Sequence, residues 1–167
     1  MIKAVFASGK KGEFGKGCTM PWPRNSRDMA NFKKLTHNTF TVMGKSTANS
    51  IPLPLPYRVP IIVSSNPSNE WITIDYTKHD VLEYLKLAIE QGIDATYSII
   101  GGTSLLTVEN LKRCNEVYYT EFKGEFLDAD VYLDKSVLSW LAEQEKEVLD
   151  DCEDFTLYKV CLLYTSD

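Results

Sequence analysis

Short apolar runs and longer amphipathic stretches alternate along the first two thirds of the chain. The apolar runs are rich in β-branched residues and predict strands at 2–7, 39–43, 59–64, 71–74 and 97–100. The amphipathic stretches predict helices at 27–36 and 79–91, and shorter helices follow glycines at 45–51 and 102–111. Strands that alternate with helices in this way indicate an α/β domain.

The last third of the chain is richer in strands, which are expected at 116–120, around 145–149 and at 155–163. Such a segment favours an antiparallel addition at the edge of a parallel sheet. The expected fold is therefore a mostly parallel central sheet with an antiparallel C-terminal strand pair, flanked by about four helices. Because no repeat or linker interrupts the pattern, residues 1–167 are expected to form one domain.

The connections after the strands are the places where a site is expected, since ligands of open α/β sheets bind at the carboxyl ends of strands. Residues 9–19 contain four glycines and predict a long mobile loop. Ser26 is expected to cap the helix at 27–36. Three prolines hold residues 52–58 in an extended conformation.

Charge and composition exclude some classes of protein. The 18 basic and 23 acidic side chains give a net charge of −5, which argues against nucleic-acid binding. The four cysteines, at 18, 114, 152 and 161, show no C-x-x-C spacing, so no metal site is expected. Scattered cysteines, the lack of a signal peptide and the lack of a long apolar run predict a cytoplasmic protein that is not in a membrane. A monomer is expected.

Asp28 is the most informative polar residue. It shares a helical face with Phe32 and Leu35, at positions i, i+4 and i+7. A carboxylate on an apolar face needs hydrogen-bond donors or a pocket, where it could bind a protonated heterocycle and move a proton. Periodicity alone leaves open the alternative that Asp28 is only a first-turn acid favoured by the helix dipole.

Three strand-end turns could hold phosphates. Gly101 and Gly102 join a strand to a helix and allow close approach of backbone N–H groups, although a plain tight turn explains the pair equally well. The turns at 44–47 and 64–66 add hydroxyl groups and one lysine, with helix capping as the alternative. Arg58 could clamp a carboxylate or form an ordinary surface ion pair.

These residues belong to an ordered series of motifs. The series comprises Ala7, 15–22 (GKGCTMPW), Asp28 with Phe32 and Thr36, 42–47 (VMGKST), 53–58 (LPLPYR), 61–65 (IIVSS), 99–102 (IIGG), 117–120 (VYYT) and 128–130 (DAD). Their joint order and spacing closely resemble the dihydrofolate reductase family over nearly the whole chain. The resemblance implies reduction of 7,8-dihydrofolate to tetrahydrofolate by hydride transfer from NADPH.

The resemblance also implies roles for individual residues. The implied catalytic residues are Asp28, which contacts the pterin and promotes protonation at N5, together with Trp22, Met20 and Thr120. The implied substrate-binding residues are Val5, Phe32, Ile51, Leu55, Ile100 and, for the glutamate tail, Arg58. The implied NADPH-binding residues are Ala7, Gly15, Gly44, Lys45, Ser46, Thr47, Ser64, Ser65, Gly101, Gly102, Thr103, Ser104 and Leu105. The bond between Gly101 and Gly102 is expected to be cis, and the loop at 9–19 to close over the site.

The chain departs from the family pattern at a few positions. Leu106 stands where an aromatic residue is common, which predicts a slower hydride step. Ser104 replaces a basic residue, so preference for NADPH over NADH is expected to depend on Lys45 and Ser65. Two alternatives are a pyrimidine reductase of riboflavin synthesis, which shares the fold, and a catalytically silent nucleotide-binding protein. Neither is expected to retain Trp22, Asp28 and Arg58 together.

Overall fold

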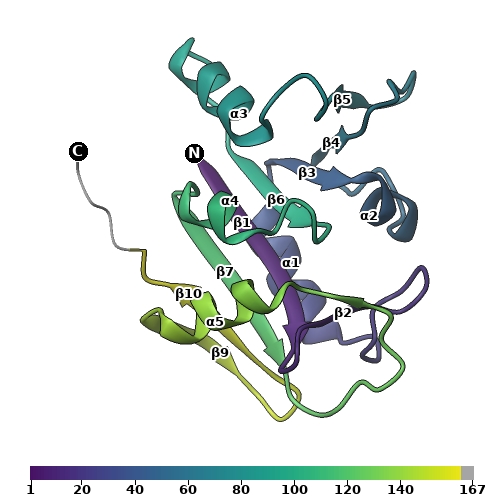
Figure 1. The fold of residues 1–167 in the computed structure, drawn as a ribbon, viewed down its shortest axis with the longest axis vertical. Helices are drawn as coiled ribbons and strands as arrows, with labels where there is room; N and C mark the ends of the chain where they lie inside the picture. The colour runs from purple at the N-terminus through teal and green to yellow at the C-terminus, as the bar shows by residue number, and fades with distance from the viewer. Residues whose placement is uncertain (163–167) are drawn as a thin grey trace.

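One twisted sheet organises the chain in the computed structural model, which describes residues 1–162 (Figure 1). Its central strand is β1 (Ile2–Gly9). One side of the sheet continues through β6 (Tyr97–Gly101), β3 (Phe40–Gly44), β4 (Val59–Val63) and β5 (Ile72–Ile74). The other side continues through β7 (Glu116–Phe122), β10 (Phe155–Val160) and β9 (Lys146–Asp151).

The strand directions confirm the expected fold class. All pairs from β5 to β7 are parallel, and the pairs of β7 with β10 and of β10 with β9 are antiparallel. Parallel neighbours need crossover connections; helices lie in most of them, whereas a loop alone joins β4 to β5. The antiparallel pair β9–β10 needs only the short turn after Asp151.

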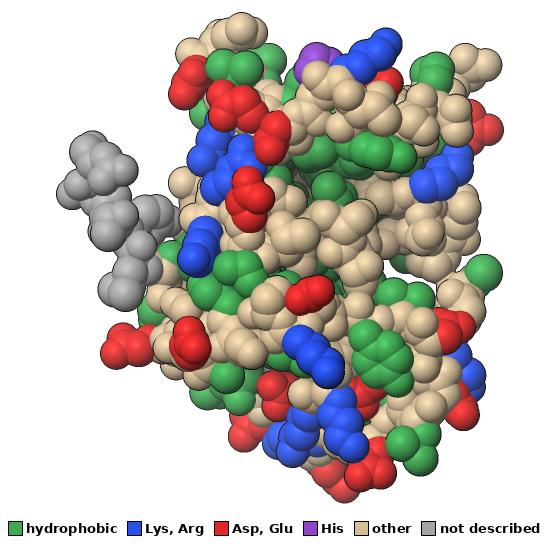
Figure 2. Space-filling model, viewed as in Figure 1, with side chains coloured by type: hydrophobic (Ala, Val, Ile, Leu, Met, Phe, Trp, Pro, Cys, Tyr) green, Lys and Arg blue, Asp and Glu red, His purple; other side chains and the backbone are tan. Residues whose placement is uncertain are grey.

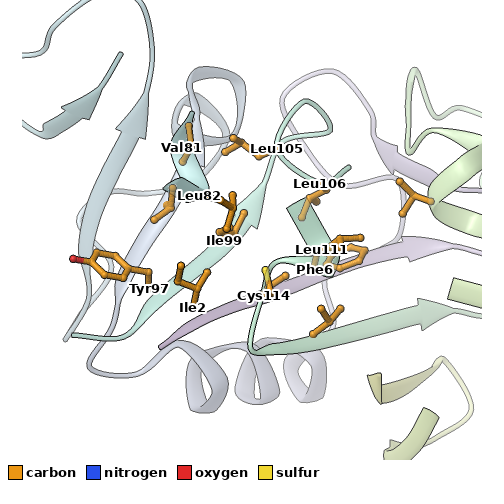
Figure 3. Close-up of a cluster of buried hydrophobic side chains, with 14 of the residues drawn as sticks. Ile2, Phe6, Val81, Leu82, Tyr97, Ile99, Leu105, Leu106, Leu111 and Cys114 are labelled. Carbon is orange, nitrogen blue, oxygen red and sulfur yellow. The ribbon is translucent and has the colours of Figure 1, made fainter. Parts of the chain in front are cut away.

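Three helices cover one face of the sheet: α3 (Val81–Glu90), α4 (Val108–Lys112) and α5 (Lys135–Glu143). They bury the larger core, in which Leu82, Leu111 and Val137 meet the strand residues Ile2 and Ile99. Figure 3 shows the part of this core where strand side chains and side chains of α3 and α4 point toward one another. This face is packed tightly and serves as the scaffold.

The opposite face carries α1 (Ser26–Thr36) and α2 (Lys45–Ser50), drawn behind and beside the sheet in Figure 1. Its apolar residues form two separate clusters. One surrounds Val5, Tyr118 and Phe155, and the other surrounds Met43, Ile62 and Ile100. Phe32 of α1 packs against both clusters, so α1 lies over the junction between them.

Three local expectations were wrong. The N-cap of α1 is Asn25 rather than Ser26, because the Asn25 side chain accepts a hydrogen bond from the backbone N–H of Asp28. The segment 9–19 is not an open loop, because it contains β2 (Glu13–Gly15), which pairs with β8 (Val131–Tyr132). The helix expected at 102–111 is reduced to α4.

The residues that the structure describes contain five helices rather than about four. The additional helix is α5, whose buried residues Val137, Trp140 and Leu141 recur at helical spacing behind an Asp134 cap. The strand expected at 155–163 corresponds to β10, and Leu163 lies outside the described residues. Within residues 1–162, no helix has the length and apolar character needed to cross a bilayer.

Candidate active site

Helix α1 places Asp28 against the sheet. Asn25 fixes the first turn by accepting from the Asp28 N–H at 2.9 Å. Phe32 and Leu35, on the same helical face, pack against the cluster on β1, β7 and β10. Burial raises the pKa of the Asp28 carboxyl group to about 6. This helical face therefore carries a carboxyl group that can exchange a proton close to neutral pH.

The sheet surface under α1 is formed by β1 and β7. Ala7 pairs with Thr120 in the parallel register. Since Tyr118 and Phe122 point into the cluster beneath α1, strand alternation places the buried Thr120 on the same face. Val5 belongs to that cluster and Ala7 packs against it. The structure thus brings the expected pterin contacts of β1 and β7 under the helix that carries Asp28.

Trp22 closes one end of this surface. It is buried and stacks on Phe122, with ring centroids 4.3 Å apart. The ring of Phe126 meets Trp22 edge-on at 5.9 Å. Met20, two residues earlier, is 53% exposed, so it lies at the surface of the molecule rather than in its core.

Arg58 is a buried cation near the other end of α1. Its Nε donates to the Pro56 carbonyl at 3.0 Å, and its Nη1 donates to the Thr36 hydroxyl at 3.1 Å. The guanidinium lies 6.0 Å from the centre of the Phe32 ring. Burial lowers the pKa of Arg58. Within residues 1–162 no carboxylate pairs with this guanidinium, although it is only 9% exposed.

The residues expected to form the walls of the substrate pocket do not all pack against the same cluster. Phe32 and Ile51 both pack against the cluster that contains Ile100. Leu55 is half-buried and lies outside that cluster. Trp71 packs against the same cluster, and sequence reasoning did not select it, because a single aromatic residue before a short strand carries no distinctive pattern.

The turn after β6 approaches α2 very closely. The Gly101–Gly102 bond is cis, as expected. A Cβ atom at position 101 would stand 2.8 Å from Thr47 Oγ1 and 3.4 Å from Phe14 Cζ, so only glycine fits. A Cβ atom at position 44 would lie 3.5 Å from the backbone nitrogen of Gly102. Phe14 was missed in the sequence, where it reads as one aromatic residue in a glycine-rich segment.

Lys45 and Ser64 lie side by side, because Gly44 pairs with Val63 at the ends of β3 and β4. Lys45, Ser46 and Ser65 are exposed, whereas Ser64 is buried and accepts from the Asn66 N–H at 3.1 Å. This edge of the sheet therefore offers an ammonium group and several hydroxyl groups to solvent.

The residues after Gly102 form a turn rather than an immediate helix. Thr103 is half-buried and Ser104 is exposed. Leu105 donates its N–H to the Gly102 carbonyl at 3.0 Å, and its side chain is buried in the larger core with Leu106. Leu105 and Leu106 therefore contribute to the scaffold through their side chains, and the backbone N–H of each donates to the Gly102 carbonyl.

The segment that contains Gly15 is tied to the 126–133 segment. The Gly15 carbonyl accepts from the Asp130 N–H, and the Asp130 carboxylate accepts from the Gly17 N–H, both at 2.9 Å. The buried Glu13 accepts from Lys11 N at 2.7 Å and from Phe126 N at 3.3 Å. These contacts hold the approach to Met20 and Trp22 in place.

The site therefore extends from the carboxyl ends of β1, β3, β4 and β6 along α1 to the amino end of β4. Figure 2 shows a recess between the surface over α2 and the surface over the segment that follows β2. Acidic and basic side chains are mixed over the lower part of that view. The arrangement can bind a ligand with a protonatable ring at one end and a carboxylate at the other, beside a phosphate-binding edge.

Comparison with known proteins agrees with this chemistry. A family model described as dihydrofolate reductase matches residues 1–163. The chain is 34% identical over 128 residues to a dihydrofolate reductase of Bacillus subtilis, covering 75% of this chain and 71% of the relative. It is 29% identical over 163 residues to dihydrofolate reductase type 3 of Salmonella typhimurium, covering 94% and 97% of the two chains.

The fold is similar to a solved structure of the same kind. The structure of dihydrofolate reductase from Enterococcus faecalis complexed with NADP(H) and RAB-propyl superposes with a TM-score of 0.74. The sequence identity is 25%, and the match covers 96% of this chain and 94% of the other.

Proposed function

The chain belongs to the dihydrofolate reductase family, and we propose how its residues divide the reduction of dihydrofolate between a substrate half and a cofactor half. The enzyme is an NADPH-dependent oxidoreductase that converts dihydrofolate to tetrahydrofolate. The family match decides against a pyrimidine reductase of riboflavin synthesis and against a silent nucleotide-binding protein.

One observation carries the substrate half. Helix α1 has a half-buried, desolvated carboxyl group, that of Asp28, near its start, and the Thr36 hydroxyl at its end contacts the buried guanidinium of Arg58. Within the described residues neither Asp28 nor Arg58 forms an ion pair. Isolated buried charges cost free energy, so a complementary ligand is expected to compensate both of them. Dihydrofolate carries a pterin that donates hydrogen bonds at one end and a carboxylate at the other.

In this proposal Asp28 accepts hydrogen bonds from N3 and the 2-amino group of the pterin. A pKa of about 6 lets the Asp28 carboxyl group supply or relay the proton that reaches N5. Thr120 joins the network through water, and Trp22 orders a water molecule near it. The backbone carbonyls of Val5 and Ile100 accept from the pterin.

The apolar walls of the pocket and the contact with the glutamate tail complete the substrate half. Phe32, Ile51 and Leu55 surround the middle of the substrate. Arg58 holds the α-carboxylate of the glutamate tail with the guanidinium N–H groups that Pro56 and Thr36 leave free. The prolines at 54 and 56 and the hydrogen bond to Thr36 limit the freedom of Arg58 before the substrate binds.

The cofactor half fits NADPH, which supplies the hydride when it is bound. Gly44, Gly101 and Thr47 bring the turn after β6 against the start of α2, and the backbone of such glycines can approach a pyrophosphate closely. The remaining proposed contacts are Ala7 and Gly15 through the main chain, and Lys45, Ser46, Ser64, Ser65, Gly102, Thr103, Ser104 and Leu105.

Lys45 and Ser65 are the proposed contacts of the 2′-phosphate. Both are exposed and stand at the ends of neighbouring strands. The ammonium group of Lys45 gives preference for NADPH over NADH, since the two cofactors differ only in that phosphate. Met20 covers the reacting rings when the segment after β2 closes.

The experiment that tests this assignment follows the loss of NADPH absorbance when dihydrofolate is added. The wild type and Glu83→Gln are expected to turn over equally, whereas Asp28→Asn is expected to be slow. Glu83 is a matched control because it is also an acid in the first turn of a helix, on the opposite face of the sheet. Equal rates in all three proteins would remove Asp28 from the mechanism.

Three broader assignments are part of the proposal. Residues 1–167 form one domain, the enzyme acts as a monomer, and it works in the cytoplasm. The thiols support the last of these, because Cys18, Cys114, Cys152 and Cys161 are all free.

A further inference from the structure

The two ends of α1 are held by different interactions. At the carboxyl end, Thr36 is the one residue of the helix that is fully buried, and it donates to the Phe32 carbonyl and accepts from Arg58. The first two turns, which contain Asp28, have no fully buried residue. Burial and the hydrogen bonds of Thr36 therefore fix the end of the helix more firmly than its beginning.

Polar side chains attach the beginning of α1 to the β9–β10 hairpin. Asp150 of β9 accepts from Arg27 Nε and from Asn31 Nδ2, each at 2.9 Å, and its second oxygen accepts from Arg27 Nη2. Asn25, the helix cap, donates to Asp154 at 3.1 Å. Three donors on α1 thus converge on the carboxylate of Asp150.

The spacing of these donors matters for Asp28. Arg27 and Asn31 are one helical turn apart, so they hold two points on the same side of the helix. Two fixed points on one side restrict rotation of the helix about its axis. Asp28 and Phe32 directly follow these two residues, so any rotation of this turn swings the Asp28 carboxyl group out of the pocket.

We propose that Asp150 is a positioning residue for the reaction: by holding Arg27 and Asn31, it fixes the rotation of α1 that aims Asp28 at the substrate. The inference rests on the role proposed for Asp28 above. Asp150 itself touches neither the pterin pocket nor the cofactor edge.

The charge state of Asp150 suits this role. Hydrogen bonds from Arg27 and Asn31 lower its pKa to about 2, so it is ionised throughout the working pH range. The neighbouring charged groups on the hairpin are Asp151, which is paired with Lys123, and Asp154, which faces Asn25. A bidentate pair of arginine with carboxylate adds directional restraint that an amide cannot reproduce.

The test compares Asp150→Asn with Asp151→Asn. Asp151 is a matched control, because it lies on the same strand and pairs with Lys123 and Thr156 without touching α1. The measurement is single-turnover hydride transfer at saturating ligands. For Asp150→Asn we expect a decrease of about threefold to tenfold at neutral pH, since small misplacements of a catalytic group are costly. NADPH affinity is expected to stay unchanged in both variants.

A merely structural role predicts a different pattern. If Asp150 acts through Asp28, lowering the pH recovers much of the lost rate, and Asp150→Asn causes no further loss in an Asp28→Asn background. Asp150→Glu is expected to recover part of the rate. Equal slowing by Asp150→Asn and Asp151→Asn, or a full additional loss in the Asp28→Asn background, overturns the proposal.

Two further outcomes separate this proposal from the one on which it rests. Normal hydride transfer in Asp28→Asn defeats the assignment of Asp28 itself. Slow transfer in Asp28→Asn with normal transfer in Asp150→Asn defeats only the positioning role. If Asp150→Asn does not fold, Arg27→Gln tests the same contact from the exposed side of the pair, with the same expected decrease.

Discussion

The substrate half and the cofactor half of the site lie on one sheet but handle charge in opposite ways. In the substrate half, Asp28 and Arg58 are desolvated. Burial raises the pKa of Asp28 and lowers the pKa of Arg58, so it favours the neutral form of each side chain. In the cofactor half, Lys45 and Ser65 are exposed, and the turn at Gly101 supplies backbone groups. A substitution in the substrate half removes a charged group from a low-dielectric environment. A substitution in the cofactor half removes a group that is surrounded by water.

This difference predicts the size and the salt dependence of the effects. Charges buried in protein interact strongly and are little screened by salt, and exposed charges interact weakly and are screened. Substrate-side variants should therefore show large losses that do not depend on salt. Cofactor-side variants should show small losses that salt removes. Each prediction below tests one side of this contrast.

The largest effect is expected for Asp28→Asn. At pH 7 and saturating ligands, single-turnover hydride transfer should decrease by about a hundredfold or more, because general acid catalysis commonly contributes that much. The NADPH dissociation constant should change by less than about twofold, since the cofactor half is intact. A comparable loss of hydride-transfer rate in Glu83→Gln would show that any first-turn carboxyl group matters. That result would contradict the special role of the substrate half.

The next effect concerns Arg58. A charge-assisted hydrogen bond of this type contributes about 1.5–3 kcal/mol, so Arg58→Leu should weaken methotrexate and dihydrofolate by roughly tenfold to a hundredfold. Trimethoprim has no glutamate tail, and its affinity should barely change. Arg113→Leu is the matched control, because Arg113 pairs with Asp80 on the opposite face of the sheet. Equal losses for tailed and tailless ligands would mean that Arg58 supports the pocket as a whole.

Asp28 should also make the folded state less stable at neutral pH. Its pKa rises from 3.8 to about 6 on folding, so the folded protein binds more protons than the unfolded chain between those values. Stability therefore falls as the pH rises through this interval. At about 1.4 kcal/mol per pKa unit the cost approaches 3 kcal/mol, and residual solvent and the helix dipole reduce it to about 1–2 kcal/mol.

The free energy of unfolding in urea measures this effect. Asp28→Asn should be more stable than the wild type by about 1–2 kcal/mol at pH 7, and the difference should nearly vanish at pH 4. A variant that is less stable at pH 7 would indicate that the Asp28 carboxylate is stabilised by its surroundings rather than desolvated.

The smallest effect is expected for Lys45→Ala. Exposed ion pairs contribute little, so the NADPH dissociation constant should rise by about threefold to tenfold, and that for NADH should not change. Raising the salt concentration should reduce the difference between wild type and variant. Lys112→Ala, at the exposed end of α4, serves as the control. A salt-independent loss of a hundredfold would place Lys45 in the same class as Asp28.

The sequence predicted the local parts of this site better than the distant ones. The spacing of Asp28, Phe32 and Leu35 predicted which side of α1 faces the sheet, and the family resemblance implied the cis bond between Gly101 and Gly102. Hydrophobic periodicity reports the neighbours along one element, so it could not show that Asp150 meets Arg27. Those two residues are 123 positions apart. The buried surroundings of Arg58 could not be predicted for the same reason, and before the family resemblance was considered its residue type favoured a surface ion pair.

The segment 9–19 shows a second limit. Its glycines predicted a loop, but Glu13 is buried and β2 pairs with β8, which lies more than a hundred residues later. Short strands of two or three residues carry too little pattern to be found without their partners. The helix α5, by contrast, had a readable cap and apolar spacing, and was missed for no physical reason.

The central claim is that a desolvated Asp28 controls proton delivery, and the pH dependence of hydride transfer tests it most directly. With dihydrofolate limiting, so that the rate reports the free enzyme, the wild-type rate should be constant at low pH and fall as the pH rises through about 6, where Asp28 loses its proton. Asp28→Asn should lack that break and become faster only as solvent protonates the substrate at lower pH. A break near 6 that persists in Asp28→Asn would contradict the account.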